Sequence, residues 1–246
     1  MKFTYSIPTK ILFGPGSFND LATTPLPGKK ALVVITAGKS MRANGYLDRL
    51  IDMLDKQGIG HALFDKILPN PVLRHVHEGA ALAREQGCDF VIGLGGGSSI
   101  DSAKSIAVMA KNPGDYWDYI SGGSGKGQPL VNGALPIVAI ATTAGTGTEA
   151  DPWTVITKED TNEKIGFGCS ETFPVLSVVD PEMMLTIPAH LTAYQGFDAL
   201  FHATEGYIAN VATPLSDAYA LKSIELLAKY LPAAVKDGSD LEARTQ

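Results

Sequence analysis

The chain has 246 residues, 45% of them hydrophobic and only 19% charged, a composition typical of a protein with a buried core and not of a disordered one. Its formal net charge of −6 offers no attraction to nucleic acid or to anionic lipid, so we expect neither as a partner. It has no apolar run close to the roughly 20 residues of a membrane span, no signal-peptide pattern at its start and only two, widely separated cysteines, so we expect a cytoplasmic protein without a disulfide framework.

The first half of the chain alternates short, continuously apolar segments with segments of helical periodicity. We expect strands at 31–36, 61–65 and 90–94, and helices at 41–57, 72–87 and 98–110. Strands that are apolar on both faces and alternate with helices are typical of a parallel sheet covered by helices on both sides. The sequence therefore predicts an α/β protein with a Rossmann-like parallel sheet.

The second half continues this pattern and then changes character. We expect a polar loop at 121–130, strands at 134–142 and 175–179, and a hairpin of 153–157 with 164–168. After Pro188 the residues have helical spacing and almost no strand signal. We therefore predict an α/β dinucleotide-binding domain over residues 1–185 and the beginning of an all-helical domain over residues 186–246.

Three consecutive glycines, Gly95, Gly96 and Gly97, follow a buried strand and precede a helix. A backbone without β-carbons can come within hydrogen-bonding distance of a diphosphate, and the start of a helix favours an anion. The Ser98 hydroxyl can donate to a phosphate oxygen or cap the helix. The pattern departs from the Rossmann fingerprint, because serine stands at the third glycine position, and it is not a P-loop. A tight turn without a ligand is the alternative.

A second polar loop, TTAGTGTE (142–149), follows the strand at 134–142. Its threonines, Thr142, Thr143, Thr146 and Thr148, place four hydroxyl groups in a short glycine-containing segment. Such a segment is suited to surround a polar ligand with O–H and N–H donors. A solvated loop of threonine and glycine is the alternative.

A third pattern places a carboxylate and an imidazole on one helical face. Asp198 and His202 are four residues apart, so both project from the same side, and Glu205 lies one turn further. A carboxylate and an imidazole make half of a divalent metal site. An ordinary surface pair of aspartate and histidine is the alternative.

Several of these motifs together resemble the iron-containing (group III) alcohol dehydrogenases. The motifs that carry the resemblance are GGGSSIDSAK (95–104), TTAGTGTE (142–149), the hairpin DPWTVIT…EKIGFG (151–168), FPVLSVVDPEMMLTIP (173–188) and GFDALFHATEGY (196–207). They occur in the order and spacing of that family, and the similarity extends from about residue 5 to the C-terminus. The resemblance implies an α/β domain followed by a helical domain, the architecture of dehydroquinate synthase, with cofactor and metal in the cleft between them.

The resemblance also implies roles for single residues. The cofactor NAD or NADP would be bound by Gly95, Gly96, Gly97 and Ser98 at its diphosphate, by Thr142, Thr143, Thr146 and Thr148 at its nicotinamide side, and by Lys164 and Leu185. Asp198 and His202 match the first two ligands of the family metal, Fe(II) with Zn(II) as an alternative, and would be catalytic. The implied reaction passes a hydride between a small alcohol and NAD(P), giving an aldehyde or ketone, in a homo-oligomer, expected to be a dimer.

The chain departs from the family pattern in one respect. Family members carry two further histidine ligands well beyond the second ligand, but no histidine follows His202 here. We therefore expect an incomplete metal site. Two hypotheses stay open: a metal-assisted alcohol dehydrogenase, and a truncated, catalytically impaired remnant that binds the dinucleotide.

The loop after the first expected strand bears on the choice of cofactor. An acidic residue in such a loop binds the adenosine ribose and repels a 2′-phosphate. This chain has Gly38 and Lys39 there, which leaves room for the phosphate and supplies positive charge, and Arg42 follows. We therefore predict that NADP is accepted at least as well as NAD.

Overall fold

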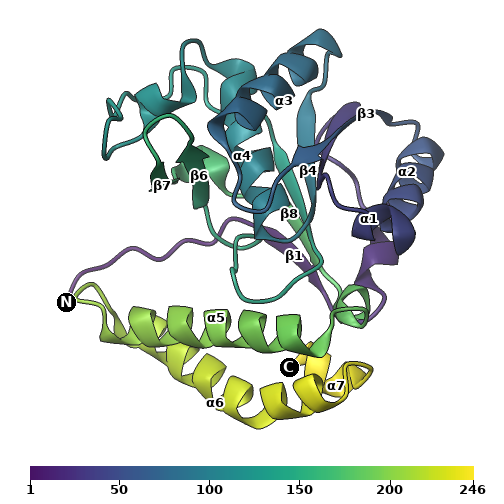
Figure 1. Cartoon of the computed structure of the whole chain (residues 1–246), viewed down its shortest axis with the longest axis vertical. Coiled ribbons are helices and arrows are strands. Elements are labelled where there is room, and N and C mark those ends of the chain that lie inside the picture. The colour runs from purple at the N-terminus through teal and green to yellow at the C-terminus, as the bar shows by residue number, and fades with distance from the viewer.

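A parallel sheet with helices on both faces forms the larger part of the computed structural model, which describes residues 1–246 (Figure 1). Its strands are β1 (Lys10–Phe13), β2 (Lys30–Thr36), β3 (Gly60–Ile67), β4 (Phe90–Gly95), β5 (Ile137–Ala141) and β8 (Leu176–Val179). They are six in number, all parallel, in the order β1-β8-β5-β4-β2-β3. The predicted α/β class with a Rossmann-like sheet is confirmed.

The strands are apolar throughout because both faces of the sheet are buried. In β2, Ala31, Val33 and Ile35 belong to one core cluster, whereas Leu32 and Val34 belong to another on the opposite face. The first cluster is covered by the short helix η1 (Ser17–Ala22) and by α2 (Tyr46–Lys56). The second is covered by α3 (Leu73–Glu85) and α4 (Gly97–Lys111).

The sequence prediction was wrong in two places near the N-terminus. The single helix expected at 41–57 is two helices, α1 (Ser40–Ala43) and α2, because Gly45 adopts a φ of 70° and turns the chain between them. Strand β1 was not predicted. It has four residues at the edge of the sheet, and its pairing with β8 depends on a segment far along the chain.

The predicted hairpin is present as a separate two-stranded antiparallel sheet. It consists of β6 (Thr154–Lys158) and β7 (Glu163–Phe167). Its inward residues, such as Ile156, join the core cluster of α3 and α4. Short helical turns η2 (Tyr116–Tyr119), η3 (Ser170–Thr172) and η4 (Pro181–Met184) complete this part of the chain.

The last quarter of the chain is helical, as predicted. Its helices are α5 (Ala189–Ile208), α6 (Pro214–Lys236) and α7 (Leu241–Thr245). Figure 1 shows α5 and α6 side by side as a hairpin, with α5 facing the sheet. The predicted domain boundary at residue 185 falls between η4 and α5 and stays a prediction. No helix has both the length and the apolar character that crossing a membrane requires.

Candidate cofactor and metal site

The three consecutive glycines form the turn between β4 and α4. Gly95 has a φ of 144°, which L-residues with side chains rarely adopt, and Gly97 is the first residue of α4. No side chain caps this helix start. The first backbone N–H groups of α4 are therefore available to an anion, and Ser98 is half-buried beside them.

The threonine loop, residues 142–148, lies directly against this glycine turn because β4 and β5 are neighbours in the sheet. The backbone N–H of Thr142 donates to the carbonyl of Gly95 at 2.9 Å. A β-carbon added at Gly96 would lie 2.8 Å from Thr143 Oγ1, and one added at Gly97 would lie 2.9 Å from Thr146 Cγ2. The glycines are thus needed for the close approach of the two loops as well as for any ligand.

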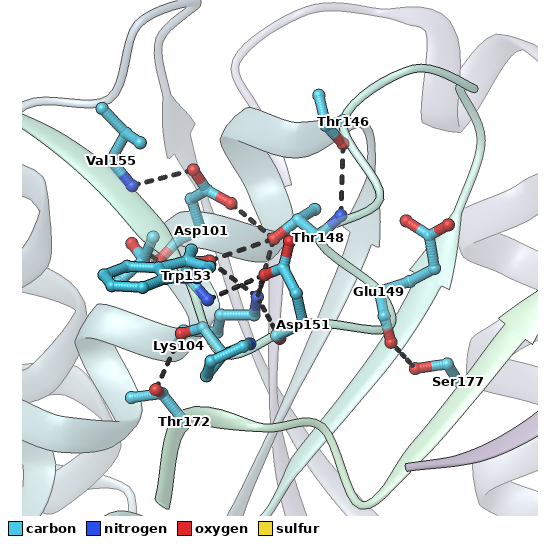
Figure 2. A network of polar contacts seen from close by, with 12 residues as sticks. Asp101, Lys104, Thr146, Thr148, Glu149, Asp151, Trp153, Val155, Thr172 and Ser177 are labelled. Carbon is cyan, nitrogen blue, oxygen red and sulfur yellow. Dashed lines mark hydrogen bonds and ion pairs between the residues drawn. The ribbon is translucent and has the colours of Figure 1, made fainter. Parts of the chain in front are cut away.

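The four threonines differ in exposure. Thr142 and Thr148 are buried, whereas Thr143 is half-buried and Thr146 is exposed. The Thr148 hydroxyl is fully used within the protein, since it donates to Asp101 Oδ1 at 2.7 Å and accepts from a buried lysine at 2.7 Å (Figure 2). Thr143 and Thr146 are therefore the members best placed to meet a ligand.

The carboxylate of this network, Asp101, is half-buried. Burial raises the pKa of Asp101 above its usual value, although the Thr148 hydroxyl and the Val155 N–H both oppose the shift. Burial also raises the pKa of Glu149, which follows the loop directly. Lys104 and Thr148, which hold the end of the threonine loop, are the buried members of this network.

The tip of the threonine loop touches helix α5. The N–H of Ala144 donates to Gln195 Oε1 at 3.1 Å. Gly145 has a φ of 107°, and a β-carbon there would lie 2.9 Å from Asp198 Oδ2. This contact joins the predicted cofactor loop to the predicted metal residues. Sequence reasoning missed Gln195, because nothing in its local pattern marks it as a partner of a loop fifty residues earlier.

Asp198 and His202 lie on the exposed side of α5 near this contact. Asp198 Oδ1 and His202 Nε2 are 3.6 Å apart, with side chains 48% and 59% exposed. Two donors that each bind one ion at about 2.1 Å in tetrahedral geometry stand roughly 3.4 Å apart, so the pair fits one divalent cation. No cluster of three or more potential metal-binding side chains is present, so Glu205 does not complete a site with them.

Lys164 and Leu185, the remaining residues implied by resemblance, lie on separate elements. Lys164, on β7, donates from Nζ to Asn70 Oδ1 at 2.9 Å, which holds the hairpin to the loop after β3. Asn70 was missed from the sequence, although asparagine tolerates the φ of 58° that it adopts. Leu185 is half-buried at the end of η4, just before α5.

The loop after β2 has free space around Gly38. A β-carbon there would approach only Thr36 Oγ1, at 3.6 Å. Lys39 is exposed, but Arg42 pairs with Asp65 on the neighbouring strand β3 at 2.5 Å. The sequence did not reveal this carboxylate, because it approaches the loop only through strand pairing. Of the two cations, Lys39 is therefore the one without an ion pair.

Comparison with known proteins identifies the family to which the chain belongs. The model of the "Iron-containing alcohol dehydrogenase" family matches residues 8–181, and that of the C-terminal part of the family, "Fe-containing alcohol dehydrogenase family, C-terminal", matches residues 192–246. The chain belongs to the iron-containing alcohol dehydrogenase family. The resemblance inferred from the motifs is thereby confirmed.

Individual members of the iron-containing alcohol dehydrogenase family resemble the chain over nearly its whole length. It is 41% identical over 243 residues to a choline dehydrogenase of Bacillus subtilis (strain 168), covering 98% of this chain and 60% of that protein. An NAD-dependent methanol dehydrogenase of Bacillus methanolicus is 38% identical, with 98% and 62% covered.

Solved structures of the family give the same result. An archaeal halo-thermophilic alcohol dehydrogenase from a Red Sea brine pool superposes with a TM-score of 0.94 at 37% identity, covering 100% of this chain and 62% of that one. The NADH-dependent butanol dehydrogenase A of Thermotoga maritima gives a TM-score of 0.91 at 34% identity, with 99% and 60% covered. The chain thus spans about three-fifths of the length of these relatives.

Proposed function

We propose that the chain is the cofactor-binding part of an oxidoreductase that passes a hydride between a small alcohol and NAD(P), with the help of a divalent metal. The observation that carries this proposal is the close approach of Gly145 to Asp198, since it joins the threonine loop, which lies against the glycine turn, to the pair of Asp198 and His202. The names of the relatives, which include methanol and butanol dehydrogenases, support the same chemistry.

The glycine turn would bind the diphosphate of the cofactor. The free N–H groups at the start of α4 and the Ser98 hydroxyl supply donors, and the helix start favours negative charge. Thr143 and Thr146 would then bind on the nicotinamide side, with Thr142 and Thr148 fixing the two ends of their loop. Lys164, held by Asn70, would approach a ribose, and Leu185 would pack near the cofactor.

Asp198 and His202 would hold Fe(II), with Zn(II) as an alternative. A divalent cation supplies Lewis acidity that stabilises negative charge on the alcohol oxygen. The contribution of the chain is to bring this pair against the threonine loop, which would orient an alcohol on the metal toward the nicotinamide. The alcohol loses a hydride to the cofactor and a proton to solvent, and becomes an aldehyde or a ketone.

The test combines binding and turnover. We expect NADH or NADPH to bind with a measurable fluorescence change, and ethanol, butanol or propanediol to reduce the oxidised cofactor in the presence of Fe(II) or Zn(II). His202→Ala should weaken binding of the metal. His190→Ala is the matched control, because it removes an exposed histidine from the same helix without touching Asp198.

Two outcomes separate the hypotheses left open by the sequence. Cofactor binding without alcohol-dependent reduction, at saturating metal, would support the dinucleotide-binding remnant. No binding of either cofactor would overturn the proposed function altogether. The homodimer and the cytoplasmic location stay predictions; light scattering after gel filtration tests the first, and localisation in cells tests the second.

A further inference from the structure

Lys104 lies on α4, and its side chain is completely buried in the protein. Its Nζ lies 2.7 Å from Thr148 Oγ1, 2.7 Å from the carbonyl of Trp153, 2.9 Å from the carbonyl of Asp151 and 3.2 Å from Asp151 Oδ1 (Figure 2). An ammonium group has three donors and no acceptor, so burial requires such partners. None of these acceptors belongs to α4. All lie in the last residue of the threonine loop and the segment that follows it.

The directions of the hydrogen bonds at Thr148 follow from the chemistry of Lys104. Because Lys104 can only donate, the Thr148 hydroxyl accepts from it, and its single proton is directed to Asp101 Oδ1 at 2.7 Å, which is closer than the Trp153 carbonyl at 3.3 Å. The other oxygen of Asp101 accepts from the N–H of Val155 at 2.9 Å. This series of hydrogen bonds, from Lys104 through Thr148 to Asp101, therefore fixes the end of the threonine loop onto α4, the helix that begins at the glycine turn.

The middle of the threonine loop has much less support. Gly145 and Gly147 adopt φ angles of 107° and 67°, and glycine is the residue with the greatest conformational freedom. The tip is held to α5 by the N–H of Ala144 on Gln195. Apart from this one bond, the loop is held over the glycine turn at its two ends, by the Thr142 bond to the β4 carbonyl and by the Thr148 bonds to α4.

We propose that Lys104 is a positioning residue for the dinucleotide, holding the threonine loop over the glycine turn in its binding conformation. The inference rests on the proposed function. It adds to the cofactor site a residue that supports the loop without touching the cofactor itself. Lys104 acts through Thr148, and thereby sets where Thr143 and Thr146 meet the ligand.

The test uses Lys104→Met, with Asn112→Ala as the matched control. Asn112 is a buried residue at the other end of α4, and it also holds a loop in place by hydrogen bonds. It donates to the carbonyl of Gly133 at 2.6 Å and accepts from the N–H groups of Val131 and Asn132. That loop lies outside the candidate site. Both variants should unfold at lower urea concentration.

Only Lys104→Met should raise the dissociation constant of NADH or NADPH, by tenfold or more, under conditions in which both variants are folded. In the absence of cofactor, the same variant should speed amide hydrogen exchange at least tenfold at Ala144, whose N–H is bonded to Gln195, whereas Asn112→Ala should leave it unchanged. A Lys104→Met protein with the affinity and exchange rates of the control would overturn the proposal.

Should Lys104→Met fail to fold, Thr148→Val tests the same chain of hydrogen bonds, because it removes the hydroxyl and keeps the shape. Exchange at the Ala144 amide should be faster in Thr148→Val and return to the original rate in Thr148→Ser, which keeps the hydroxyl; equal rates in both would reject the positioning role. Failure of the unaltered protein to bind either cofactor would refute the proposed function. The exchange measurement needs no cofactor, so it would still decide whether Lys104 holds the loop.

Discussion

The contact between the threonine loop and α5 can be tested by adding one methyl group at Gly145. Its φ of 107° is strained for any residue with a β-carbon, and that carbon would lie 2.8 Å from the Gln195 carbonyl oxygen and 2.9 Å from Asp198 Oδ2. Strain of this kind costs about 1–3 kcal/mol. Because the neighbouring atoms are backbone and carboxylate oxygens, we expect relief of the contact to move the loop tip away from α5.

Gly145→Ala should therefore lower the free energy of unfolding and also weaken binding of the divalent metal and of the cofactor. Gly147→Ala is the matched control: it has a φ of 67° in the same loop, but a β-carbon there meets nothing within 4 Å. The control should lose only about 1–2 kcal/mol of stability, the usual cost of a left-handed conformation, and keep its affinities.

Urea unfolding gives the stabilities, and calorimetric titration with Zn(II) and with NADH gives the affinities. The decisive quantity is the difference between the two variants. If Gly145→Ala binds Zn(II) and NADH as tightly as Gly147→Ala does, then the loop tip does not couple the two parts of the site. The interpretation of the contact would then be refuted, whatever the loss of stability.

Three further predictions concern other residues. Gly38→Asp should shift the cofactor preference toward NAD by about 1–3 kcal/mol, because it places a carboxylate near the 2′-phosphate of NADP. Dissociation constants of both cofactors measure this shift, and a tenfold or greater preference of the unaltered protein for NAD would contradict the role given to this loop. Burial lowers the pKa of His75 below its ordinary value of 6.5, so its contribution to stability is present above pH 6.5 and is lost as the pH falls through the folded-state pKa; urea unfolding against pH should show this loss, and His75→Phe should remove it. Asp180→Ala should lower the free energy of unfolding by about 3 kcal/mol, because the N–H groups of Gly16, Phe18 and Glu182 lose a charged acceptor; a loss under about 1 kcal/mol would show that water replaces the carboxylate.

Local patterns in the sequence predicted most of the fold. The apolar segment at 31–36 required burial on both faces, and the glycine run at 95–97 required a turn between a strand and a helix. The prediction failed where a single residue or a distant partner decided the outcome. Gly45 split a helix that periodicity alone had continued, and β1 became a strand only because β8 was there to pair with it.

By itself, the sequence determined the class of the protein, the two glycine-containing loops and the spacing of Asp198 and His202, because each depends on residues that are neighbours along the chain. The tertiary structure decided which of these residues meet. The strand order β1-β8-β5-β4-β2-β3 brings the ends of strands from distant segments to one edge of the sheet. Contacts such as Gly145 with Asp198, Lys164 with Asn70 and Lys104 with Thr148 join residues that no periodicity relates, so only packing of the folded chain could specify them.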